Sequence, residues 1–171
     1  MGKLDDKTVL VSGGARGIGA AIARAVVGEG GRVVIGDVLD DDGAQIVTEL
    51  GEERARFVQL DVTDGAQWRD AVATAESTFG PVSVLVNNAG IVRWGTVADL
   101  DPAVWQEVLG VNLTGVFLHR RRSRRCDAPA VVARWSTSHH DHLAFVRTIR
   151  LMDISLTRGY LREIPVDQFA R

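Results

Sequence analysis

Short apolar runs alternate with longer amphipathic stretches over residues 1–118. The runs are rich in β-branched residues and nearly continuous, at Val9–Val11, Val33–Ile35, Phe57–Leu60 and Val82–Val86. Strands that are buried on both faces of a parallel sheet have this pattern. The runs therefore predict four parallel strands, with an open, apolar edge at Val82–Val86.

The stretches between the runs predict helices near 20–29, 43–50 and 66–79, and a fourth helix from Pro102 to about Leu118. Asp101 is a favourable N-cap for the fourth helix, and proline is preferred at the first helical position. This alternation predicts an α/β fold with right-handed crossovers. The expected architecture is the N-terminal half of a Rossmann-type, doubly wound parallel sheet of about four strands.

A glycine-rich turn joins the first predicted strand to the first predicted helix. It reads Ser12-Gly13-Gly14-Ala15-Arg16-Gly17-Ile18-Gly19. Gly13 permits a tight reversal, Gly17 lacks the Cβ that would hold a pyrophosphate away, and Gly19 lets helix and strand pack closely. The helix N-terminus offers free N–H groups and a positive partial charge to phosphates. The turn therefore predicts a dinucleotide site.

Asp37 ends the second predicted strand, 18 residues after Gly19. A carboxylate at about this spacing accepts hydrogen bonds from the adenosine ribose hydroxyls. NAD therefore fits better than NADP, because a 2′-phosphate would meet the like charge of Asp37. Arg16 is the only nearby cation in the sequence that could compensate this charge. The alternative interpretation of Asp37 is a turn carboxylate at a strand end, and the glycine turn favours the ribose.

Three further clusters follow the later strands. Asp61-Val62 is expected to hydrogen-bond to or pack on the adenine, and in Asn87-Asn88-Ala89-Gly90 small residues allow close approach while an amide ties neighbouring strands. Asn112 lies inside the fourth predicted helix, where a polar side chain competes with the backbone. A turn, a cap or a solvated position would explain each cluster alone. Their order along the chain favours a ligand site.

Composition changes abruptly after Leu118. Up to that residue there are 9 basic and 17 acidic residues, and after it 11 arginines and 5 acidic residues. Seventeen of the 18 glycines precede the change, whereas all four histidines follow it. The change divides the chain into a predicted NAD-binding Rossmann half at 1–118 and an atypical Arg- and His-rich tail at 119–171.

Bulk composition restricts the partners and the compartment. The chain of 171 residues has a net charge of −2, which gives no bulk attraction to nucleic acid or membranes. Cys126 is the only cysteine, so no internal disulfide can form. No apolar stretch is long enough to span a bilayer, and the N-terminus lacks the apolar segment of a secretory signal. We expect a cytoplasmic protein with no membrane partner.

Together with the segment Val111-Asn112-Leu113-Thr114-Gly115, these motifs resemble the short-chain dehydrogenases/reductases from Leu4 to Leu118. The segments Val11–Gly17 and Gly36-Asp37 are most similar to bacterial 3α/20β-hydroxysteroid dehydrogenases. The resemblance implies hydride transfer between NAD(P) and a secondary alcohol or ketone, with a hydroxysteroid as one candidate. It implies cofactor contacts along the chain. The residues are Gly13, Arg16, Gly17, Ile18, Gly19, Asp37, Asp61, Val62, Asn88, Ala89 and Gly90. It also assigns Asn112 to catalysis, holding a water in a proton relay.

The family also uses a serine and a Tyr-x-x-x-Lys pair, in which the cation lowers the pKa of the tyrosine so that it can exchange the substrate's proton. This chain departs from that pattern. Its only tyrosine, Tyr160, is followed four residues later by Ile164, and its only lysines are Lys3 and Lys7. Candidate serines by residue type alone are Ser136, Ser138 and Ser155. The sequence therefore predicts impaired turnover.

A shifted reading frame explains the departure. If each codon starts at the third base of the present one, the segment from Arg125 to His140 can read Met-Arg-Arg-Ala-Gly-Gly-Gly-Gly-x-Val-Val-Asn-Ile-Ser-Ser. That sequence resembles the family's glycine-rich turn and fifth strand. Our hypothesis is that a frameshift near Leu118 replaced the catalytic half, which would make the chain a truncated or frameshifted family member.

Two other interpretations stay open. The arginines of 120–125 could bind nucleic-acid phosphates, although a solvated charge run is commoner, and His139, His140 and His142 lack further ligands at a zinc spacing. The chain could also be a non-catalytic, dinucleotide-binding remnant. Its open sheet edge would then cause aggregation, and the tetramer usual in the family is not expected.

Overall fold

The computed structural model describes residues 2–96 and 98–118, together with two strands at 131–136 and 150–154. The strands are β1 (Thr8–Ser12), β2 (Arg32–Asp37), β3 (Ala55–Gln59), β4 (Val82–Asn87), β5 (Val131–Ser136) and β6 (Arg150–Ile154). The helices are α1 (Gly17–Gly28), α2 (Asp40–Leu50), α3 (Gly65–Phe79) and α4 (Pro102–Leu109), which continues through a π-helical turn, η1 (Gly110–Thr114), to Leu118.

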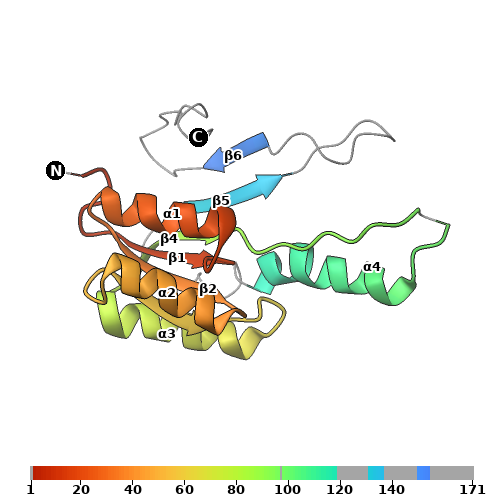
Figure 1. The fold of residues 1–171 in the computed structure, drawn as a ribbon, viewed down its shortest axis with the longest axis horizontal. Coiled ribbons are helices and arrows are strands. Elements are labelled where there is room, and N and C mark those ends of the chain that lie inside the picture. Colours follow the sequence, from red (N-terminus) through yellow and green to blue (C-terminus); the bar gives the residue numbers. More distant parts are fainter. Residues whose placement is uncertain (1, 97, 119–130, 137–149, 155–171) are drawn as a thin grey trace.

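The strands form one sheet in the order β3-β2-β1-β4-β5-β6 (Figure 1). The first five are parallel, and β6 runs antiparallel to β5. In the centre, Leu10 of β1 lies opposite Val34 of β2 and Leu85 of β4. The four strands expected from the apolar runs are confirmed, and so is the Rossmann-like α/β class.

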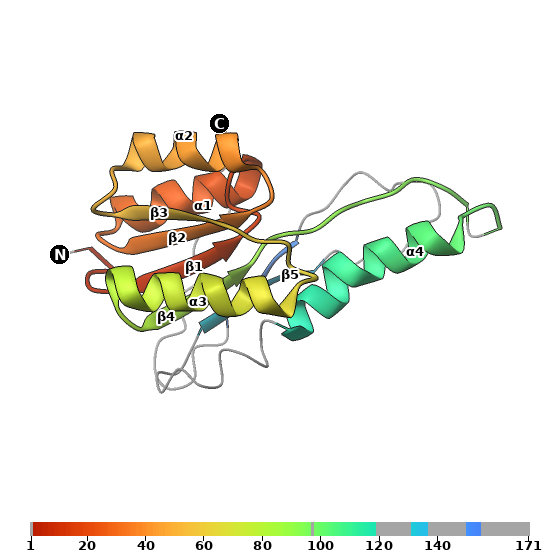
Figure 2. The same ribbon diagram turned by 90° about the horizontal axis from the view of Figure 1, so that it is seen from below.

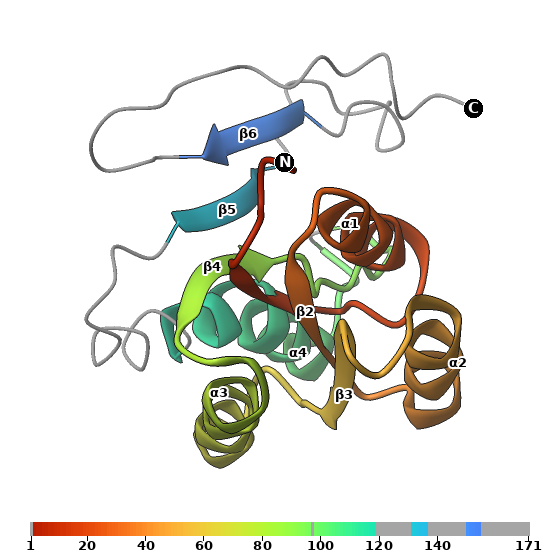
Figure 3. The same ribbon diagram turned by 90° about the vertical axis from the view of Figure 1, so that its left-hand side faces the viewer.

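Alternate residues of each central strand point to opposite faces of the sheet. Val9, Val11 and Ile35 belong to the core under α1 and α2, whereas Leu10 and Leu85 belong to the core under α3. Figure 3 shows the two helices on one side of the sheet and α3 on the other. All five residues of β1 are buried. Burial on both faces explains why the runs are continuous rather than alternating.

The expectation that Val82–Val86 forms an open edge is wrong. β5 pairs with β4 in parallel, with Val84 opposite Val131 and Asn87 opposite Arg134. The unpaired N–H and C=O groups that would have promoted association are therefore used within the sheet. The sheet thus has six strands rather than four, because two strands of the 119–171 tail extend it. The arginine run, the tail histidines and Tyr160 lie outside the described residues.

The helices begin earlier than their apolar patterns suggest. α1 starts at Gly17, inside the glycine turn, and α2 starts at Asp40, with three aspartates in its first turn. Acidic residues there interact favourably with the helix dipole, so a run without apolar residues is helical. The capping prediction for the fourth helix is confirmed, because Asp101 Oδ1 accepts a hydrogen bond of 2.7 Å from Ala103 N.

α4 and the segment before it project beyond the carboxyl ends of β1 and β4 (Figure 2). Arg93 Nη2 and Glu107 Oε1, 2.6 Å apart, join the segment to the helix. No residue of α4 is buried, and several large apolar side chains on and around this helix are exposed. These are Val92, Trp94, Trp105, Leu113 and Phe117. We refer to residues 91–118 as the arm.

Candidate functional site

The glycine-rich turn packs against the end of β4. Gly13 has a φ of +64°, and a Cβ added to it would lie 2.8 Å from Ala89 Cα. A Cβ on Gly19 would overlap the carbonyl oxygen of Gly13 and lie 2.6 Å from Asn88 Nδ2. The close packing at Gly19 is therefore against the turn itself and against the residue that follows β4, rather than against a strand. Gly17 faces open space with a φ of +56°, so backbone conformation favours glycine there, and room remains for a ligand.

Asn88 and Ser12 bind the turn to the sheet. The Asn88 amide nitrogen donates to Gly13 O at 2.8 Å and to Ser12 O at 3.2 Å. The Ser12 hydroxyl donates to Val86 O and accepts from the backbone N–H groups of Asn88 and Ala89. The prediction that an amide ties neighbouring strands is confirmed. The role of the Ser12 hydroxyl was missed, because it depends on contacts with β4.

Asp37 is 8 % exposed and joins the same turn from the other side. Its Oδ2 accepts a hydrogen bond of 2.9 Å from Ala15 N, and its Oδ1 accepts from Val38 N and Leu39 N at 2.8 and 3.3 Å. A carboxylate has about four acceptor positions, of which three are used here. Asp37 thus holds the turn in place, and among the described residues one acceptor position of Oδ2 has no partner.

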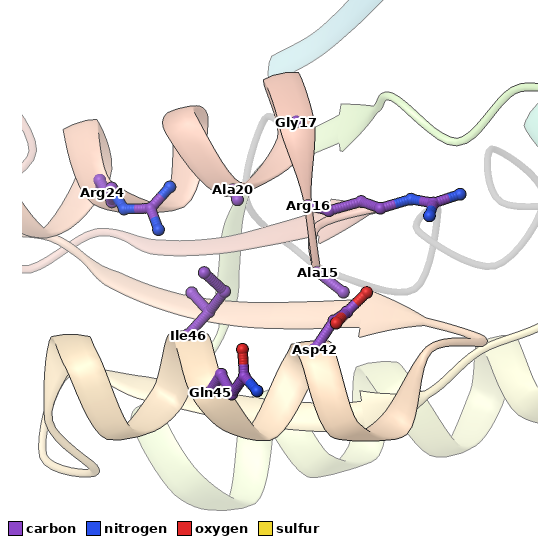
Figure 4. A pocket seen from close by; sticks show the side chains of 8 residues that line it. All are labelled: Ala15, Arg16, Gly17, Ala20, Arg24, Asp42, Gln45 and Ile46. Atoms are coloured by element: carbon purple, nitrogen blue, oxygen red, sulfur yellow. The ribbon is translucent and has the colours of Figure 1, made fainter.

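A cavity of about 270 Å³ lies between the start of α1 and α2. Its lining residues are Ala15, Arg16, Gly17, Ala20, Arg24, Asp42, Gln45 and Ile46. Figure 4 shows the Arg16 side chain extending away from Arg24 and from the middle of the cavity. Asp42 adds a second carboxylate beside the turn, which the sequence analysis missed because α2 has to fold back to bring it there.

The charge of Arg24 is partly compensated outside the cavity. Its Nε and Nη2 each lie 2.7 Å from a carboxylate oxygen of Glu49, so that α1 and α2 are joined by a two-point ion pair. Hydrogen bonding to Arg24 lowers the pKa of the Glu49 carboxyl, and the same bond raises the pKa of Arg24. Both side chains are half exposed, so the pair is screened by solvent.

The turn after β3 is held by Trp68 and Thr63. The fully buried Trp68 donates its indole N–H to Val62 O at 2.9 Å, and Val62 itself is buried. Asp61 Oδ1 accepts from the backbone N–H and the hydroxyl of Thr63 at 2.8 and 2.7 Å. Asp61 and Val62, the two residues expected to contact the adenine, are therefore held in place by these hydrogen bonds. The Val62 side chain lies in the core beside Leu60.

Asn112 is fixed to the chain that follows β4. Its Oδ1 accepts from Ile91 N and its Nδ2 donates to Ile91 O, both at 2.9 Å. Asn112 lies in the π-helical turn η1, and single π turns often occur at functional sites. Within the part of the chain that the structure describes, the second Oδ1 lone pair and the second Nδ2 hydrogen have no partner, which is enough to hold a water.

The described site thus joins the glycine turn, Asp37 and Asn88 in one hydrogen-bonded cluster, with Arg16 and Ile18 exposed at the start of α1. Gly90 and Asn112 lie next to Ile91. The positive φ values, the space at Gly17 and the remaining acceptor of Asp37 fit a dinucleotide. Ser136 lies in β5, whereas Ser138, Ser155 and Tyr160 lie outside the described residues.

Residues 7–125 match the sequence pattern of the short chain dehydrogenase family. This chain belongs to that family. A 3-alpha-(or 20-beta)-hydroxysteroid dehydrogenase from Mycobacterium tuberculosis is 56% identical over 117 residues, which are 68% of this chain and 45% of the relative. An NADP-dependent (R)-specific alcohol dehydrogenase from Lentilactobacillus kefiri is 42% identical over 120 residues, which are 70% of this chain and 48% of the relative.

The fold of this family member agrees with a solved structure from the family. A short-chain dehydrogenase/reductase from Brucella melitensis superposes with a TM-score of 0.72 at 28% identity, covering 76% of this chain and 57% of the other. The chain spans about half the length of the curated relatives it matches. Among the described residues, no helix is long and apolar enough to cross a membrane.

Proposed function

We propose that the chain binds NAD at the carboxyl ends of β1 to β4 and descends from oxidoreductases of secondary alcohols and ketones. The observation that carries this proposal is the cluster in which Asp37 and Asn88 hold the glycine turn from both sides. The turn then presents the N-terminus of α1 to a pyrophosphate, with Arg16 and the 42 % exposed Ile18 beside it. The bound nicotinamide would supply or accept the hydride.

The charges near the turn support NAD over NADP. Asp37 ends β2, and Asp42 lines the cavity beside Arg16. A 2′-phosphate in this region would approach two carboxylates, while Arg24 is already engaged by Glu49 and the Arg16 side chain extends away from the middle of the cavity (Figure 4). The name of the Lentilactobacillus relative shows that NADP dependence occurs among proteins of this kind, so we base the NAD preference on Asp37 and Asp42 alone.

The adenosine is proposed to lie between the ends of β2 and β3. Oδ2 of Asp37 would accept a ribose hydroxyl, and Asp61 and Val62 would contact the adenine. Ala89 and Gly90 would allow the dinucleotide to pass close to the end of β4, as small residues do in sheets of this type. Asn112, fixed by Ile91, would hold a water for proton transfer.

The substrate is proposed to be a secondary alcohol or ketone, with a hydroxysteroid as the first choice. The identity of 56% to a mycobacterial enzyme named for hydroxysteroids supports that choice. The printed sequence lacks Tyr-x-x-x-Lys, so no tyrosine with an adjacent lysine can exchange the substrate's proton. We therefore propose a chain that binds the nucleotide and turns over poorly or not at all.

We also propose that residues 119–171 arise from a shifted reading frame. The family match ends at residue 125, close to the change in composition after Leu118. Resequencing the gene, or measuring the intact mass of the natural protein, tests this. An undisturbed frame through the tail that is retained in close relatives would contradict it.

Binding and turnover separate the proposals. The purified chain should quench or shift NADH fluorescence on binding, and it should show no steady oxidation of NADH with a panel of cyclic ketones that includes steroids. Binding with ordinary turnover would contradict the loss of catalysis. Absence of nucleotide binding, together with a salt-dependent shift of DNA in a gel, would favour the nucleic-acid alternative.

A further inference from the structure

Gly115 is the only buried residue between Pro102 and Leu118. It follows the π-helical turn directly and contacts the turn after β3. A Cβ added to it would lie 2.9 Å from Val62 Cγ2, and 3.1 Å from both Val62 Cβ and Val62 O. Two of these three atoms lie on or next to the backbone, so Val62 would have to move.

Val62 is poorly placed to move. Its carbonyl accepts the indole N–H of Trp68, which is fully buried, and its side chain belongs to the core under α3. Val111 and Leu118 pack against the same core, on the helix that carries Gly115. Figure 2 shows the end of this helix beside the beginning of α3. A larger residue at 115 would therefore displace either the helix or the turn that holds Val62.

The same helical segment also reaches the end of β4, because Asn112 is bonded to Ile91. Residues 112–115 thus contact the turns after β3 and β4 within one helical turn. These are the two strand ends between which the adenine side and the nicotinamide side of a dinucleotide would extend. Gly115 and Asn112 therefore join this helical segment to both turns.

We propose that Gly115 is a positioning residue for adenine binding, because its missing side chain lets the Asp61-Val62 turn keep the place from which it would contact the base. The proposal rests on the proposed nucleotide site. It concerns a residue outside the glycine turn and outside the strand ends themselves. Alanine is the better helix former, so Gly115→Ala should be favourable unless the contact with Val62 matters.

The test measures the affinities of Gly115→Ala for NADH and for 5′-AMP, which carries adenine without nicotinamide. We expect the affinities for NADH and for 5′-AMP to fall about tenfold each, which corresponds to about 1.4 kcal/mol of binding free energy. The matched control is Gly28→Ala, another helical glycine, where an added Cβ meets nothing within 4 Å. It should bind both ligands like the wild type. Circular dichroism verifies that each variant is folded.

Val62→Ala distinguishes positioning from general damage to the fold. It removes the closest atom, Val62 Cγ2, so Gly115→Ala should cost less affinity for 5′-AMP in that background than alone. Val62→Ala by itself should also lower the affinity for 5′-AMP, which keeps the proposal testable if Gly115→Ala does not fold. Unchanged 5′-AMP affinity in Gly115→Ala, or equal losses in both backgrounds, would overturn the inference. Failure of the wild type to bind either ligand would instead refute the proposed function.

Discussion

The carboxylate of Asp37 lies 2.9 Å from the backbone nitrogen of Ala15 and accepts its hydrogen bond. This contact joins the end of β2 to the glycine-rich turn that follows β1, across 22 positions of the chain. One side chain thereby shapes the proposed phosphate site and sets the charge at the proposed ribose site. Loss of this carboxylate should therefore affect stability and cofactor choice together.

Asp37→Asn should lower the affinity for NADH by about tenfold and that for NADPH by less, so that the preference for NADH falls. Removing one partner of a buried, charged hydrogen bond should also reduce the free energy of unfolding by about 1–3 kcal/mol. Fluorescence titration and urea unfolding measure the two effects. Asp70→Asn, at an exposed position on α3, is the matched control and should change neither. An unchanged ratio of the two affinities would exclude Asp37 as the selecting residue.

Asn88→Ala should destabilise the protein by about 1–3 kcal/mol, because the carbonyl groups of Ser12 and Gly13 lose their donor in a partly buried place. The glycine turn would lose its anchor to β4, so NADH should also bind more weakly. Thermal unfolding and NADH titration check both effects. Gln106→Ala, at an exposed position on α4, should leave them unchanged. Wild-type stability in Asn88→Ala would show that the turn holds its shape without this amide.

The pair of Arg24 and Glu49 predicts a small dependence of stability on pH. Because hydrogen bonding lowers the pKa of Glu49 in the folded state, its stabilisation is complete above the ordinary carboxyl pKa of about 4.3. It is lost as the pH falls through the lower, folded-state pKa. Glu49→Gln should thus lower the Tm slightly at neutral pH, and the difference should vanish in acid and shrink with salt. A Tm difference that grew in acid would contradict this sign, and Glu52→Gln is the exposed control.

The exposed side chains of the arm predict self-association. Trp105, Leu113 and Phe117 are 52 %, 63 % and 58 % exposed along one helix, and apolar surface of this kind promotes aggregation. Replacing Leu113 and Phe117 together by serine should raise the highest concentration up to which the chain sediments as a monomer. Unchanged or increased association in the double variant would locate the cause elsewhere.

The central strands were predictable because strands covered by helices on both faces need uninterrupted apolar runs, as at Val33–Ile35. The start of α2 was harder to predict from the sequence, since Asp40 begins a polar turn that is stabilised by the helix dipole. The π-helical turn around Asn112 leaves no mark in the apolar pattern. The contacts of Asp37 with Ala15 and of Gly115 with Val62 depend on tertiary proximity, so spacing alone could suggest a role for Asp37 and none for Gly115.

Calorimetric titration of the purified wild-type chain with NADH, and with NADPH under the same conditions, tests the central claim most directly. The account predicts saturable binding of NADH at one site per chain, and binding of NADPH at least about tenfold weaker. Absence of NADH binding by a folded chain, or tighter binding of NADPH, would contradict it.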